Sequence, residues 1–272
     1  MAKDFRFGVG LLPKDSRSAW QEAARRAEGL GFDVINVPDH LGAPAPFPAL
    51  MSAAEVTTVR LGTFVLNAGF YKPALLARDV AALDMLSDGR FELGLGAGYV
   101  REEFEAAELP FPSAGRRVDY LEHMTAYMQE HVNSVPILIA GSGDRVLTIA
   151  AQRVNIIGIA AGRRAGTAID PVGERVEFVR RAAGDRFDDI ELNLAIIGVP
   201  RHGTGVPNLS LARRYSPDLS EDELRKLPGV LTGTPRDIAD TLRTHRDTYG
   251  LTYFTVQEHH AESFSKVIAE LR

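Results

Sequence analysis

The segment RLGTFVLNAGFYKPALLARDVAALDMLSDGRFELGLGAG, residues 60–98, is the part of the chain that says most about its architecture. Two short apolar runs, RLGTFVLN (60–67) and FELGLGAG (91–98), flank a helical segment. Near-continuous apolar runs of this length are typical of parallel strands that are buried on both faces. The helix is expected to begin at Pro73, whose ring suits the first helical turn, and to end at Gly89. The segment therefore predicts a strand–helix–strand unit.

The same alternation of strand and helix continues along the 272 residues. Eight strands, each followed by a mostly helical segment, predict an α/β fold with a closed (β/α)8 TIM barrel that spans residues 1–272 as a single domain. A polar, irregular segment near residues 200–230 is expected to be an excursion over one barrel face. The alternative is an open, doubly wound sheet that uses GLGAG (94–98) as a dinucleotide loop, but its G-x-G-x-G spacing differs from the G-x-G-x-x-G of that motif. The predicted strands lie within residues 5–11, 34–38, 60–67, 91–98, 136–141, 156–161, 191–199 and 253–257.

Composition excludes several classes of protein. The chain has no cysteine, which rules out disulfide bonds, thiolate metal sites and a cysteine nucleophile. Its net charge is −5 with acidic and basic residues interspersed, so we expect no nucleic-acid partner. No apolar run approaches the roughly 20 residues of a membrane span, so we expect no membrane association and a cytoplasmic location. The histidines of QEHH (257–260) have no third ligand at a metal-binding spacing, so we expect a polar loop at the barrel mouth and no metal.

The strand ends hold the candidate catalytic residues, because active sites of such barrels lie at the carboxyl-terminal face. Asp39 and His40 follow the second predicted strand side by side. Histidine exchanges protons near neutral pH, and a nearby carboxylate favours its charged form. We therefore expect His40 to donate or accept a proton and Asp39 to orient it, although a helix cap or a polar corner is an alternative. Tyr99, after the fourth strand, can donate a proton, stack on a ring or simply pack.

Small residues at the other strand ends are candidates for contact with a ligand. Glycine lets the backbone approach a flat or phosphorylated ligand closely, and free N–H groups at a helix start suit a phosphate or carboxylate. Ordinary turns between strand and helix use the same residues, so both interpretations stay open. The candidates are Asn67 and Ala68 after the third strand, Gly96, Ala97 and Gly98 after the fourth, and Gly141, Ser142 and Gly143 after the fifth.

Several longer segments resemble one known family. DMLSDGRFELGLGAG, together with AEGLGFDVINVPDHLG, PILIAGSGDRVLTIAA and LTGTPRDIADTL, is similar to the luciferase-like monooxygenase superfamily, in particular to its branch of probable oxidoreductases that depend on the deazaflavin coenzyme F420. The resemblance implies a barrel with a redox ring across its mouth, faced by Asp39 and His40. It also implies a bulge or non-proline cis peptide near Asn67 and Ala68, cofactor walls made by the glycines after strands four and five, and a homodimer.

The chain departs from this family at three places. Tyr99 stands where deazaflavin sugar-phosphate dehydrogenases have a glutamate, and Tyr71-Lys72-Pro73 replaces the usual Arg-His-Pro. In MTAYMQEHVNSVPILIAG (124–141) the fourth helix also passes directly into the fifth strand, where relatives carry a few dozen residues that partly cover the site. We therefore expect a more open mouth and a bulky substrate such as a polyketide, a peptide or a carrier-bound intermediate.

The expected reaction is hydride transfer to or from a C=C, C=N or C=O group with coenzyme F420. One alternative keeps the fold and uses FMN, as a monooxygenase supplied by a separate reductase. Another is a catalytically degenerate family member that acts as a binding subunit.

Overall fold

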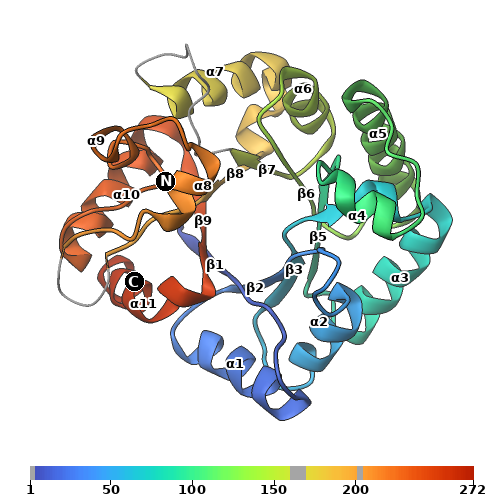
Figure 1. Ribbon diagram of the computed structural model, residues 1–272, viewed down its shortest axis with the longest axis horizontal. Helices are drawn as coiled ribbons and strands as arrows, with labels where there is room; N and C mark the ends of the chain where they lie inside the picture. The colour runs from blue at the N-terminus through green and yellow to red at the C-terminus, as the bar shows by residue number, and fades with distance from the viewer. Residues whose placement is uncertain (1–3, 160–169, 201–204) are drawn as a thin grey trace.

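A computed structural model describes residues 4–159, 170–200 and 205–272. The strands close into a parallel barrel, seen along its axis in Figure 1, which confirms the predicted fold class. The third barrel strand is split into β3 and β4, and because both pieces pair with β5 in parallel, the ring closes. The strands are β1 (Arg6–Gly10), β2 (Val34–Val37), β3 (Arg60–Thr63), β4 (Leu66–Asn67), β5 (Phe91–Gly96), β6 (Ile137–Gly141), β7 (Ile156–Ile159), β8 (Glu191–Ala195) and β9 (Leu251–Gln257).

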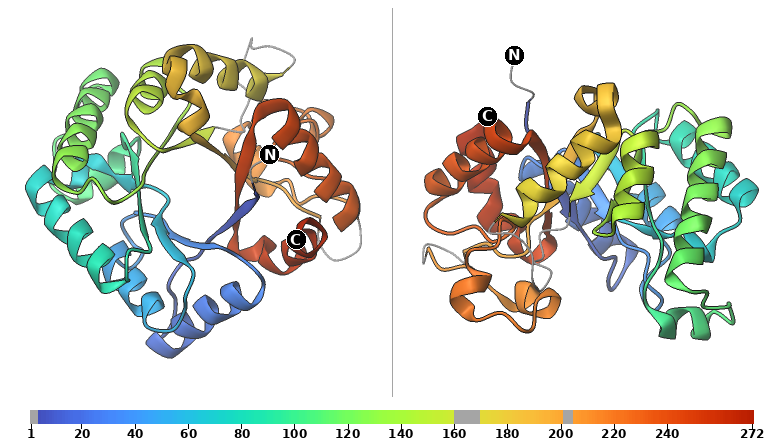
Figure 2. Two further views of the ribbon diagram at one scale, coloured as in Figure 1. Left: turned by 180° about the vertical axis from the view of Figure 1, so that it is seen from behind. Right: turned by 90° about the horizontal axis from the view of Figure 1, so that it is seen from above.

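Helices surround this barrel on its outside (Figure 2). The helix after the third barrel strand begins at Pro73, as predicted, and its chain turns at Asp88 and Gly89, where φ is 56° and 73°. The long helices are α1 (Arg17–Gly29), α2 (Pro46–Ala54), α3 (Pro73–Leu86), α5 (Ala114–His131), α6 (Asp144–Arg153), α7 (Pro171–Ala183), α10 (Pro235–Tyr249) and α11 (Ala261–Leu271). The shorter turns are α4 (Arg101–Ala106), α8 (Ser210–Tyr215), α9 (Glu221–Leu224), and the 3-10 helices η1 (Ala68–Phe70), η2 (Gly184–Asp189) and η3 (Glu258–His260).

The excursion after β8 contains α8 and α9 and returns to the barrel through backbone hydrogen bonds. Ile197 N donates to Gly229 O at 2.7 Å, and Leu231 N donates to Gly198 O at 2.8 Å. The last residues predicted for the sixth barrel strand, 160 and 161, and residues 201–204 of the excursion lie outside the described residues.

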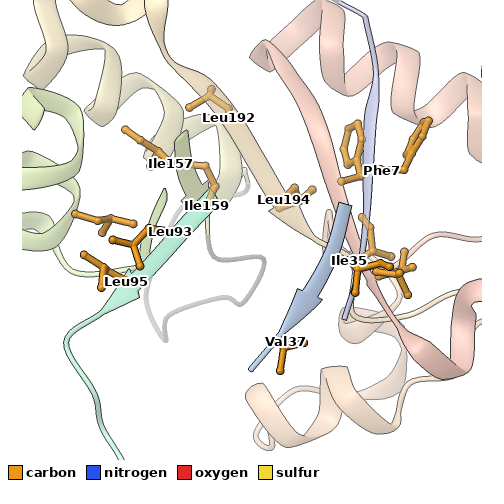
Figure 3. Close-up of a cluster of buried hydrophobic side chains, with 14 of the residues drawn as sticks. Phe7, Ile35, Val37, Leu93, Leu95, Ile157, Ile159, Leu192 and Leu194 are labelled. Carbon is orange, nitrogen blue, oxygen red and sulfur yellow. The ribbon is translucent and has the colours of Figure 1, made fainter. Parts of the chain in front are cut away.

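The main core lies between the strands and the helices. Alternate strand residues supply it, such as Phe7, Ile35, Leu93 and Ile157 (Figure 3). The positions between them face the barrel interior and are often glycine, because space there is short. A Cβ atom on Gly8 would lie 2.6 Å from Asn36 Nδ2. Some interior positions are large and apolar, and Val34, Leu138, Ile156 and Tyr253 form a second, smaller buried cluster.

A charged cluster closes the amino-terminal end of the barrel. Arg6 donates to both carboxylate oxygens of Glu92, at 2.8 and 3.0 Å, and its Nε lies 3.2 Å from Glu191 Oε1. Arg60 pairs with the same Glu92, and the Arg6 guanidinium lies 4.5 Å from the ring centre of Tyr253. Burial opposes the charge of Arg6, but the two carboxylates outweigh it and raise the pKa of Arg6. These groups occupy the strand starts, so the interior is filled from that end.

The short connection between α5 and β6 also lies at the amino-terminal end. Residues 132–136 join the end of a helix to the start of a strand, and Val132 and Val135 within them are buried. Strand starts and strand ends are at opposite ends of a parallel barrel. The expectation that this shortening opens the mouth of the site is therefore wrong, because the segment is on the other face.

Candidate active site

Asp39 connects the ends of two neighbouring strands at the carboxyl-terminal face. Its Oδ2 accepts a hydrogen bond from Asn67 N at 3.0 Å, and its carboxylate also accepts one from the Tyr71 hydroxyl. Burial raises the pKa of Asp39, while these two hydrogen bonds and the nearby His40 act in the opposite direction. The pKa of Tyr71 is raised in turn by burial and by Asp39. Asp39 thus fixes the segment after β4 against the end of β2.

His40 pairs with a residue of α4 rather than with its sequence neighbour. Its Nδ1 lies 2.8 Å from Oε1 of Glu103, whose side chain is 16% exposed, whereas that of His40 is 48% exposed. An ionised carboxylate can only accept a hydrogen bond, so Nδ1 carries the proton and Nε2 is left for proton exchange. The expectation that Asp39 orients His40 is wrong, because Asp39 is engaged by Asn67 and Tyr71 and Glu103 takes this position instead.

Glu103 and Tyr71 are the functional candidates that the sequence reasoning did not identify. Glu103 stands in REEF (101–104), where acidic residues in a first helical turn ordinarily favour the helix start. The feature that could have identified Glu103 is its position shortly after a barrel strand, next to the buried Phe104. Tyr71 stands out in the sequence as a departure from the family pattern, and its place just before the third helix left open whether it reaches the site or only precedes that helix.

The predicted cofactor residues after the third and fourth barrel strands pack against one another. Asn67 is buried, and its Oδ1 accepts from Gly69 N at 3.1 Å, which caps η1. A non-proline cis peptide joins Phe64 to Val65, between β3 and β4 and slightly before the position that the resemblance implied. A Cβ on Gly96 would lie 2.8 Å from Val65 Cγ2, and one on Gly98, where φ is 71°, would overlap the Asn67 side chain.

The remaining candidates lie at the same barrel end in more open positions. Ala68 is buried, and Ala97 is half-buried against the core. Gly141 packs against Val146, whereas a Cβ on Gly143 would meet nothing within 4 Å. Ser142 is exposed, and Tyr99 is 72% exposed in the loop after β5. Contact of these residues with a cofactor, and proton donation by Tyr99, remain predictions.

A cavity of about 430 Å³ opens at the carboxyl ends of β1, β2, β3 and β9. Gly10 contributes bare backbone, Asn36 and Gln257 contribute amides, and Phe64 contributes an aromatic ring. Pro38, which also lines the cavity, directly precedes Asp39 in the chain. The predicted polar loop at the mouth is present, since Gln257, Glu258 and His259 line this cavity. Lys14 and Glu258 form an ion pair of 3.0 Å at its edge.

This set of groups fits a planar heterocycle that is polar at its edges. Amide groups can both donate and accept hydrogen bonds, a phenyl ring can stack, and a glycine wall leaves room for a flat face. Among the described residues, no three histidine or acidic side chains gather as they would around a metal ion. Within the same ranges, no helix is both long and apolar enough to cross a bilayer.

Comparison with known protein families finds one match. Residues 5–133 match the model of the luciferase-like monooxygenase family, so this part of the chain is similar to that family. The match contains β1 to β5 and α1 to α5, and therefore includes Asp39, His40, Tyr71 and Glu103.

Curated relatives of the chain include an enzyme named for coenzyme F420. The chain is 36% identical over 106 residues to an F420-dependent glucose-6-phosphate dehydrogenase from Kribbella flavida, covering 35% of this chain and 32% of the relative. It is 33% identical over 107 residues to a 5,10-methylenetetrahydromethanopterin reductase from Methanopyrus kandleri, covering 39% and 30%. The chain thus spans about a third of the length of these two relatives.

Solved structures share the fold over nearly the whole chain. An F420-dependent secondary alcohol dehydrogenase superposes with a TM-score of 0.76 at 18% identity, covering 99% of this chain and 100% of the other. A long-chain alkane monooxygenase gives 0.74 at 15% identity, covering 99% and 92%. At these identities the likeness shows the fold, which both F420 enzymes and monooxygenases use.

Proposed function

We propose that the protein is a coenzyme F420-dependent oxidoreductase that transfers a hydride to or from a C=C, C=N or C=O group. The observation that carries this proposal is the combination, at the carboxyl-terminal face of the barrel, of the His40–Glu103 pair with a cavity whose lining suits a flat, polar ring. Sequence likeness to an F420-dependent glucose-6-phosphate dehydrogenase supports the choice of cofactor. Gly10, Asn36, Phe64 and Gln257 would hold the ring, together with the predicted walls after β5 and β6.

When bound, the deazaflavin supplies the hydride, that is, two electrons and one hydrogen nucleus, or takes it back in the reverse direction. The protein supplies the proton that balances the charge. In the reducing direction, His40 Nε2 protonates the oxygen, nitrogen or carbon that gains negative charge, and Glu103 stabilises the ring while its charge changes. Because His40 is half exposed, solvent returns the proton afterwards.

The roles of Asp39 and Tyr71 differ from that of His40. Asp39 is held by two hydrogen bonds and connects β2 to the segment after β4, so it positions the cavity wall. We therefore propose it as a positioning residue and His40 as the catalytic one. The substrate is proposed to be a small molecule or a carrier- or peptide-borne group, and the expected homodimer and cytoplasmic location stay predictions.

The cofactor choice is tested by parallel fluorescence titration with F420 and FMN, followed by turnover of the reduced F420 with a panel of enones and imines. We expect micromolar binding of F420, weaker binding of FMN, and reoxidation of the reduced F420, followed by its absorbance, only when substrate is present. Tight FMN binding without F420 binding would instead support the monooxygenase alternative. Two comparisons suggest that alternative: the match to the monooxygenase family model and the fold shared with an alkane monooxygenase. Binding of neither would overturn the proposal.

A further inference from the structure

Large apolar side chains exposed in the described residues fall into two groups. One group, Leu75, Met85 and Leu86, lies on α3. The other lies in segments that follow the carboxyl ends of barrel strands and consists of Leu12, Leu41, Tyr99, Val206 and Tyr215. Contiguous exposed apolar surface on a soluble protein commonly marks a site of interaction. We call Leu12, Leu41, Tyr99 and Tyr215 the apolar rim.

The apolar rim is assembled from segments far apart in the sequence. Leu12 follows β1 and lines the mouth cavity, Leu41 follows His40 at the end of β2, and Tyr99 follows β5. Tyr215 ends α8 in the excursion after β8. Figure 1 shows α8 and α4, the helix that begins two residues after Tyr99, on opposite sides of the barrel axis. Burial raises the pKa of Tyr215, and Tyr99 acts in the same direction.

The character of these side chains indicates a neutral ligand. Tyrosine presents a broad apolar face with a polar tip, which suits rings that carry oxygen or nitrogen substituents. The charged groups of the mouth are compensated within the protein, since Lys14 pairs with Glu258 and His40 with Glu103. The cavity lining thus lacks, among the described residues, an unpaired cation of the kind that recognises a phosphate ester.

The volume of the cavity gives a second argument about the substrate. The cavity of about 430 Å³ is near the lower end of the roughly 300–1,000 Å³ that ligand pockets span. On the proposed function, a cofactor ring and the reacting group must share this space. Any larger part of the substrate then lies outside the cavity, where the apolar rim is.

We propose that the substrate is a neutral compound with an extended apolar or aromatic body, held by the apolar rim with Tyr99 and Tyr215 on its two sides while its reacting double bond enters the cavity beside His40. This inference rests on the proposed function for the reaction, but its binding surface is separate from the groups that transfer the proton. It gives a structural basis for a bulky substrate that does not depend on the short α5–β6 connection.

The binding half of the proposal is tested without cofactor or turnover. The neutral naphthyl ketone prodan serves as the probe, and its fluorescence is titrated with wild type, Tyr215→Ser, the Tyr99→Ser/Tyr215→Ser double variant and Met85→Ser. We expect prodan affinity to fall about tenfold in each step from wild type to double variant, as removal of an aromatic contact implies. Met85→Ser, equally apolar and 69% exposed but on α3, is the matched control and retains wild-type affinity. Equal prodan binding by all four proteins would overturn the proposal.

The selectivity half uses F420-linked turnover of two enones, chalcone and 2-cyclohexen-1-one. The ratio of their kcat/KM values should favour chalcone in wild type and fall about tenfold or more in the double variant. Tyr99→Phe keeps the ring face and should keep the ratio. If Tyr99→Phe instead loses turnover of both enones, Tyr99 is a proton donor and its place in the apolar rim is refuted.

Two further outcomes separate the hypotheses. Rim-dependent prodan binding without turnover of any enone would refute the proposed reaction and leave the binding surface in place. A change of sedimentation coefficient in the double variant, absent in Met85→Ser, would identify the apolar rim as a contact between copies of the chain and overturn the substrate proposal.

Discussion

The two ends of the barrel use charged residues in opposite ways. At the amino-terminal end, Glu92 is 4% exposed and is engaged by both Arg6 and Arg60. At the carboxyl-terminal end, Glu103 engages a single half-exposed imidazole, His40. A closed network stabilises a structure, whereas a group with a free proton site facing solvent can do chemistry. The same ring of strands therefore separates stability at one end from reactivity at the other, as is general for such barrels.

The largest effect is expected from breaking the closed end. Glu92→Gln leaves the guanidinium groups of Arg6 and Arg60 without their shared carboxylate, and breaking such a buried pair costs about 3–5 kcal/mol of unfolding free energy. Urea unfolding followed by circular dichroism measures it. Glu55→Gln is the control, because its pair with Arg17 is exposed and should contribute less than about 1 kcal/mol. Equal losses in both variants would contradict the contrast between the ends.

At the open end, removing the imidazole should affect rate rather than folding. His40→Ala is expected to lower kcat of the F420-linked reaction by about 10²–10⁴-fold, the usual contribution of a general acid or base. Its unfolding free energy should stay within about 1 kcal/mol of wild type, since the side chain is half exposed. A kcat within about threefold of wild type would remove His40 from the mechanism.

Two glycines of the open end distinguish packing from ligand contact. Gly98→Ala places a Cβ against the Asn67 side chain at a positive φ, so we expect about 1–3 kcal/mol of destabilisation. Gly143→Ala meets open space and should leave stability unchanged. If Gly143 lines the cofactor site, only this second variant will lose F420 affinity while keeping its thermal midpoint, as calorimetry and titration together can establish.

The pair partner of His40 gives a smaller effect. Glu103→Gln retains a hydrogen-bond acceptor but removes the charge that stabilises the imidazolium, so kcat should fall about tenfold. Because Glu103 acts through His40, the dissociation constant for F420 should not change. Combining the change with His40→Ala should add no further loss of kcat, and a fully additive double variant would show that the two residues do not act as a unit.

The smallest expected effect is a pH dependence of stability that comes from Asp39. Its raised pKa means that the folded protein holds this proton more tightly than the unfolded chain, whose value is near 3.8. The stabilisation is present below that value and is lost as pH rises through the raised folded value. Asp39→Asn should remove this step from the curve of unfolding free energy against pH. An unchanged curve between pH 3 and 7 would exclude Asp39 as its source.

Local patterns predicted elements better than they predicted contacts. The helix that starts at Pro73 and the chain turn at Gly89 follow from backbone chemistry within a few residues, and both are found. The position of Asp39 and His40 at a strand end likewise follows from the residues next to them in the sequence. Glu103 is separated from His40 by 63 residues, and only barrel closure brings α4 to the end of β2. The wrong interpretation of the short α5–β6 connection had the same origin, because which barrel end a segment covers depends on topology.

The sequence by itself determined the (β/α)8 barrel, the order of its elements and the location of a titratable pair at its functional end, because periodicity, helix starts and turns are encoded by neighbouring residues. The tertiary structure decided that Asp39 accepts hydrogen bonds from Asn67 and Tyr71 and that Glu103 pairs with His40. It also decided that Arg6, Arg60 and Glu92 close the opposite end. Those choices depend on side chains from distant segments competing for the same few hydrogen-bond positions. Only the closed barrel fixes which of them come within reach.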